Sequence, residues 1–180
     1  MRNNMINIDS KIEMRFFITV ISAFAVCVGL TGCSGYSNES LYPKKVSSVY
    51  VEMFDNRSFW RGVEYKLTDA LAKRIEAQTP YKVVSSRDRA DSIINGQIVS
   101  IDQAGLSTER QTGRLLEKEV LLEAVVSWKD LKTGELLMNN QTVNASASYS
   151  EWQSQGFDYA SALAANKLAQ QIVEQMEVGW

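Results

Sequence analysis

Apolar and polar positions alternate along the second half of the chain in a pattern that predicts two long strands. In the stretch 119–128, EVLLEAVVSW, the even-numbered positions are apolar, which is the period of a strand with one buried face. After the turn sequence KDLKTGE, the stretch 136–149, LLMNNQTVNASASY, carries Leu137, Val143 and Tyr149 on odd-numbered positions. Together these stretches predict a long hairpin. The Asn, Ser and Thr residues of its second strand fit either a solvent-exposed face or a polar surface that meets another protein.

The rest of the pattern predicts the layers around this hairpin. Residues 46–54 read as a strand with Val49, Val51 and Met53 on one face, and 81–86 and 90–102 read as two further strands. Two helices are expected from apolar positions at helical spacing. In 63–78 these are Val63, Leu67, Ala70, Leu71 and Ile75, and in 158–176 they are Ala162, Ala165, Leu168, Ala169, Ile172, Val173 and Met176. The order β-α-β-β-β-β-α predicts an α+β two-layer sandwich, in which two helices cover one face of a largely antiparallel sheet of four to five strands. Residues 46–180 are expected to form one such domain.

An apolar run at residues 16–30 precedes this domain and points to export. The run follows Arg15 and is shorter than the roughly 20 residues of a spanning helix, as expected of a signal peptide. Leu30-Thr31-Gly32-Cys33 resembles the lipobox of bacterial lipoproteins, in which the cysteine thiol receives a diacylglyceryl group and becomes the first residue. We therefore expect removal of residues 1–32, lipid attachment at Cys33 and a flexible linker over 33–45. An ordinary secretory signal is the alternative.

Two further features of the leader bear on this interpretation. Asp9 and Glu13 suit a basic leader poorly, so translation starts at either Met1 or Met14. Ser34 follows the lipidated cysteine, which in lipoproteins of this kind favours transfer to the outer membrane. Two or three acyl chains hold such a protein at a bilayer almost permanently.

Composition excludes several classes of function. Without residues 1–32, 16 basic and 19 acidic residues remain, a formal net charge of −3, so the basic surface that nucleic-acid binding needs is not expected. The chain has no histidine, and Cys33 is the one cysteine left after cleavage. Catalytic triads with histidine and the usual zinc ligand sets are therefore excluded. No P-loop, GxGxxG or HExxH motif occurs. The chain is predicted to be no enzyme and to hold no cofactor or metal, although a carboxylate-pair hydrolase stays formally open.

Several segments taken together resemble one family. They are the lipobox, the linker, the opening VYVEMFDNRSFWRGVEYKLTDALAKRIE followed by YKVV, the strand ADSIINGQIVSI, the long hairpin and the last helix. In this order they resemble the LptE family of lipopolysaccharide-assembly lipoproteins. The resemblance implies an outer-membrane lipoprotein that faces the periplasm, forms a heterodimer with the barrel LptD as its plug, and binds lipopolysaccharide. The alternative is a periplasmic lipoprotein that regulates peptidoglycan synthesis or assembles a secretion pore, since such proteins begin with a similar strand.

Two segments are candidate contact sites. Phe59, Trp60 and Arg61 lie between the first strand and the first helix, where they either contact the partner or cover the edge of the core. Trp152 and Phe157 precede the last helix and pack either on a barrel wall or, as we expect, on their own helix.

A further candidate is the segment 104–118, AGLSTERQTGRLLEK, expected as a loop or hairpin tip. It displays Arg110, Arg114 and Lys118, and the resemblance to LptE implies that this region contacts lipopolysaccharide. A guanidinium group can hold a phosphate through two charge-assisted hydrogen bonds. In the alternative interpretation these cations pair with Glu109, Glu117 and Glu119 in a solvated loop.

Overall fold

The computed structural model describes residues 42–177. Its elements are β1 (Ser48–Val51), β2 (Asp55–Asn56), α2 (Val63–Gln78), β3 (Lys82–Val83), the 3-10 turn η1 (Arg87–Arg89), β4 (Ser92–Thr108), β5 (Leu115–Asp130), β6 (Leu136–Tyr149), the 3-10 turn η2 (Glu151–Gln153) and α3 (Phe157–Gln175). The predicted signal peptide 1–32, Cys33 and linker residues 33–41 lie outside the described residues. None of the helices within 42–177 is both long and apolar enough to cross a membrane.

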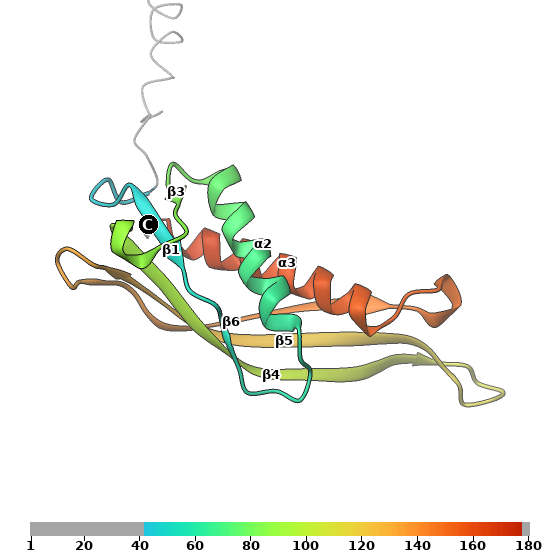
Figure 1. The fold of residues 1–180 in the computed structure, drawn as a ribbon. Coiled ribbons are helices and arrows are strands. Elements are labelled where there is room, and N and C mark those ends of the chain that lie inside the picture. Colours follow the sequence, from blue (N-terminus) through green and yellow to red (C-terminus); the bar gives the residue numbers. More distant parts are fainter. Residues whose placement is uncertain (1–41, 178–180) are drawn as a thin grey trace, which may run out of the picture. The chain divides into compact units, whose positions relative to one another are not determined.

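One mixed sheet carries the fold. Its strand order is β3-β1-β4-β5-β6, and β2 pairs with β4 beside β1. The strands β4, β5 and β6 form an antiparallel meander, whereas β1, β2 and β3 join by parallel pairing. Figure 1 shows α2 and α3 on the same side of this sheet. The predicted α+β architecture is confirmed, with short parallel strands added to the antiparallel part.

The core lies between the two helices and the sheet. All five apolar positions predicted for α2 are buried, as are the even-numbered positions of β5 from Val120 to Trp128. Helix α3 faces the sheet and α2 with small residues such as Ala160, Ala164 and Ala165, which let it lie close to both. Ala162, which the sequence pattern placed on this stripe, is only half-buried.

The first strand is shorter than predicted. Strand β1 ends at Val51, and the chain pairs again with β4 only at β2. Between them Phe54 is buried at 2 % exposure, whereas Met53, which was expected on the buried face, is 48 % exposed. The ring of Phe54 occupies the space above Gly96, where a Cβ atom would come within 2.5 Å of Phe54 Cε1. The local break in pairing therefore reversed the expected alternation.

A bulge changes the alternation of β6 as well. Trp128 pairs with Met138 but Val126 pairs with Gln141, so β6 contains one extra residue. At this point Asn140 has a φ of 45°, and its side-chain and backbone amide groups both contact the Ser127 hydroxyl. Before the bulge Met138 is fully buried, whereas Leu137, which was expected on the buried face, is only partly buried against the core. The odd-numbered positions from Val143 to Tyr149 are buried as predicted.

Candidate functional site

The long β4–β5 hairpin ends in a short turn. The strands extend to Thr108 and from Leu115, so the loop comprises residues 109–114 and is shorter than the predicted 104–118. The backbone N–H of Glu109 donates to the Arg114 carbonyl at 2.8 Å, and Gly113 adopts a φ of 70° that suits glycine. The turn therefore has a defined shape, on which Arg110 and Arg114 are displayed.

The three predicted cations of this hairpin have different environments. Arg110 is exposed and forms no ion pair within residues 42–177. The Arg114 guanidinium lies 4.6 Å from the ring centroid of Trp152, in a cation–π contact. Lys118 Nζ lies 2.6 Å from a carboxylate oxygen of Glu151.

Two of the three cations, Arg114 and Lys118, therefore contact residues of the turn η2. The alternative pairing with Glu109, Glu117 and Glu119 is not found in the described part of the chain. Glu109 instead accepts a hydrogen bond from the Thr112 hydroxyl. The hydrogen bond from Lys118 lowers the pKa of Glu151, and the same bond raises the pKa of Lys118. Sequence reasoning missed these contacts because Glu151 lies 33 residues beyond Lys118.

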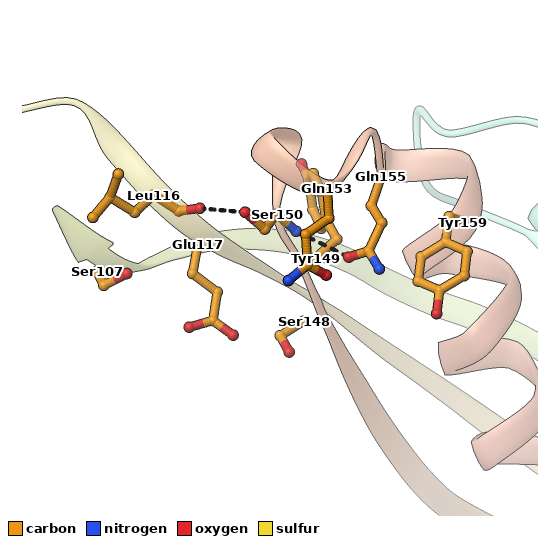
Figure 2. Close-up of a pocket in the computed structure, with 9 residues that line it drawn as sticks. All are labelled: Ser107, Leu116, Glu117, Ser148, Tyr149, Ser150, Gln153, Gln155 and Tyr159. Atoms are coloured by element: carbon orange, nitrogen blue, oxygen red, sulfur yellow. Dashed lines mark hydrogen bonds between the residues drawn. The ribbon is translucent and has the colours of Figure 1, made fainter. Parts of the chain in front are cut away.

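A pocket of about 460 Å³ lies beside these residues. It is lined by Ser107, Leu116, Glu117, Ser148, Tyr149, Ser150, Gln153, Gln155 and Tyr159, as Figure 2 shows. Ser150 forms two hydrogen bonds with other lining residues. Its hydroxyl donates to the Leu116 carbonyl at 3.0 Å, and its backbone N–H donates to the Gln155 side chain at 3.1 Å. These two bonds join the start of β5 to the segment around η2.

Phe59, Trp60 and Arg61 have different environments. The ring of Trp60 stacks on Phe157 at the start of α3, with centroids 3.9 Å apart, so Trp60 covers the edge of the fold. Arg61 donates to the Asn56 carbonyl at 3.3 Å, and Phe59 is 99 % exposed. Phe59 is the residue of this trio for which the described part of the chain shows no ring contact or side-chain hydrogen bond.

The aromatic residues before α3 also differ from each other. Phe157 packs against the core and on Trp60, whereas Trp152 is 64 % exposed and contacts Arg114. The expected packing on their own helix is therefore wrong for Trp152. Within the described ranges, no three His, Cys, Asp or Glu side chains are grouped so that they could hold a metal ion.

Comparison with known proteins places the fold. A family model for lipopolysaccharide assembly, LptE, matches residues 46–176. The chain belongs to the LptE family. As a member of this family it is a lipoprotein of lipopolysaccharide assembly, and the family is not one of enzymes. The match favours this role over the alternatives of peptidoglycan regulation and secretion-pore assembly. None of the curated proteins matches the sequence.

Two solved structures share the fold at low sequence identity. An uncharacterized lipoprotein B from Nitrosomonas europaea is 18 % identical, with a TM-score of 0.53 over 79 % of this chain and 88 % of that one. The hypothetical protein CT253 from Chlamydia trachomatis is 13 % identical, with a TM-score of 0.50 over 72 % of this chain and 95 % of that one. These similarities show the fold of this chain alone.

Proposed function

We propose that this LptE-family protein is anchored through Cys33 in the outer membrane, faces the periplasm, and forms the plug of the LptD barrel. In this role it contacts lipopolysaccharide with the tip of its β4–β5 hairpin. The family match and the cationic tip support the proposal together. The tip concentrates Arg110, Arg114 and Lys118 on a chain whose formal net charge is negative.

The geometry of the tip suits a phosphate. Arg110 has no competing ion pair among the described residues, and Arg114 rests on the face of Trp152, which leaves its N–H groups without a carboxylate partner there. Guanidinium groups bind phosphate in a bidentate manner. Lys118 is paired with Glu151, but ion pairs that are open to solvent on one side are weak, so a phosphate can displace the carboxylate.

The surface for the barrel is expected to be polar. On the sheet face away from the helices, β6 displays Thr142, Asn144 and Ser148, and all three are exposed. Such side chains satisfy an interface by hydrogen bonds and remain hydrated when the partner is absent. These residues and Phe59 are the proposed contacts with the barrel. Because the strand face is polar, we expect the unbound protein to be a folded monomer.

Lipopolysaccharide contact is tested by titrating the intact lipoprotein in detergent with lipopolysaccharide at two ionic strengths. The double variant Arg110→Ala/Arg114→Ala is expected to bind at least about tenfold more weakly at low salt, because charge-assisted hydrogen bonds are lost. Arg87→Ala/Arg89→Ala in η1 is the matched control, since it removes the same charge from exposed residues at the opposite end of β4. Equal affinity of both variants and the wild type would exclude the tip as a ligand site.

Anchoring and partnership are tested separately. The Cys33→Ala variant should no longer sediment with outer membranes, and the wild type should co-purify with LptD from solubilised outer membrane. Depletion of the protein should leave the barrel misassembled. Retention of the Cys33→Ala variant in the outer membrane, or normal barrel assembly after depletion, would contradict the respective part of the proposal.

A further inference from the structure

The pocket beside η2 is lined by polar side chains, several of which form no hydrogen bond within the described residues. The side chains of Glu117, Ser148, Gln153 and Tyr159 line it and form no hydrogen bond to another side chain or backbone group in residues 42–177. Figure 2 shows Glu117, Ser148 and Tyr159 pointing to the same side. Tyr159 is 51 % exposed, so part of its ring is open to a ligand.

These groups match the chemistry of a sugar ring. A carboxylate, an amide and hydroxyl groups accept from and donate to the hydroxyl or amino groups of a pyranose. A half-exposed aromatic ring offers an apolar face to its C–H groups. The volume of about 460 Å³ lies within the range of small-ligand sites, but the lining is mainly polar, which suits a hydroxyl-rich ligand better than an apolar one.

The pocket is joined to the cationic tip by one short segment. Ser150 and Gln153 line the pocket, while Glu151 and Trp152 between them contact Lys118 and Arg114. A ligand that carries a phosphate on a sugar ring can therefore contact the cations and the pocket together. A phospholipid without a sugar would contact only the cations.

We propose that this pocket is a saccharide subsite, which binds a sugar ring of a phosphorylated glycolipid through Gln153, Glu117 and Tyr159. This inference rests on the proposed function, in which the cationic tip contacts lipopolysaccharide. It adds that the protein distinguishes a glycolipid from other anionic lipids by its sugar.

The experiment compares two lipids on the intact lipoprotein in the same detergent. Lipid A carries phosphates on a glucosamine disaccharide, whereas phosphatidic acid carries a phosphate and acyl chains but no sugar. The double variant Gln153→Ala/Tyr159→Ala removes two exposed pocket groups, and Tyr65→Ala removes a tyrosine of similar exposure from α2 as the control. Thermal unfolding of each variant establishes that it is folded.

We expect the pocket variant to bind lipid A about five- to tenfold more weakly and phosphatidic acid as the wild type does. The variant Arg110→Ala/Arg114→Ala should bind both lipids more weakly. If the pocket variant binds lipid A normally, or loses affinity for both lipids equally, the saccharide subsite is wrong while the role of the tip stands. If the arginine variant binds lipid A like the wild type, the proposed contact at the tip fails, and the inference that rests on it fails too.

Discussion

Asp91 joins three parts of the sheet, and its replacement by asparagine tests how the fold is held together. One carboxylate oxygen accepts hydrogen bonds from the backbone N–H groups of Ser47 and Ser48, at 3.1 and 3.0 Å. The other lies 2.5 Å from Lys132 Nζ, in the turn between β5 and β6. Asparagine keeps the size of the side chain but loses the charge. Its side chain has one accepting oxygen, so it cannot accept from the backbone N–H groups and from Lys132 with two separate oxygens.

The expected loss follows from the pKa of this carboxyl group. The Lys132 ammonium, together with the N–H groups of Ser47 and Ser48, lowers the pKa of Asp91 from 3.8 to about 2. This change corresponds to at most about 2.5 kcal/mol of stability at neutral pH. Because the ion pair lies near solvent, screening reduces the expected cost of Asp91→Asn to about 1–1.5 kcal/mol.

The direction of the pKa change determines how the stability that Asp91 contributes depends on pH. The pKa of Asp91 is lower in the folded protein, so its contribution is fully present above about pH 4 and disappears as the pH falls towards 2. Urea unfolding of wild type and Asp91→Asn at pH 7 and at pH 3 measures both differences. The smallest loss of unfolding free energy expected at pH 7 is about 1 kcal/mol. A loss below about 0.5 kcal/mol at pH 7, or an equal loss at both pH values, would refute the stabilising role of the Asp91 carboxylate.

Further expectations concern the fold edge and the tip. Trp60→Ala should lower the free energy of unfolding by about 1–2 kcal/mol because it removes an aromatic stack. Phe59→Ala should change that free energy by no more than about 0.5 kcal/mol and should weaken co-purification with LptD. Equal effects of the two variants on stability would contradict the different roles assigned to Trp60 and Phe59. Gly96→Ala should cost about 2 kcal/mol in chemical unfolding, because its Cβ would overlap Phe54 and a backbone carbonyl; a neutral effect would mean that the ring moves aside at no cost. Glu151→Gln should raise lipid A affinity by freeing Lys118; unchanged affinity in the variant would show that this pair does not compete with the ligand.

Local patterns predicted the parts of this fold in which alternation is uninterrupted. The buried face of β5 and the five apolar positions of α2 are correct because each element keeps its period throughout. The expectation for Met53 is wrong because pairing breaks between β1 and β2. Leu137 is only partly buried, and Met138 takes the fully buried position, because a bulge at Asn140 shifts the alternation by one residue. Such shifts depend on how two strands pair, and a single strand's sequence does not encode them strongly.

The candidate site shows the same limit at longer range. The cations of the hairpin were visible in the sequence as a local concentration of charge, but their partners were not. Nearby carboxylates were the natural candidates, yet Lys118 contacts Glu151 and Arg114 contacts Trp152, both from a segment after β6. The pairing of β5 with β6 brings this segment beside the tip of the β4–β5 hairpin, since Lys118 lies opposite Tyr149.

The central claim is that the hairpin tip meets lipopolysaccharide in the cell. A photo-crosslinking amino acid at Gln111, between Arg110 and Arg114, tests it directly, with the same amino acid at the exposed Glu76 near the end of α2 as the control. After irradiation of living cells, we expect a lipopolysaccharide adduct from position 111 and none from position 76. Absence of an adduct at 111, in a strain where the protein is present and co-purifies with LptD, would contradict the account.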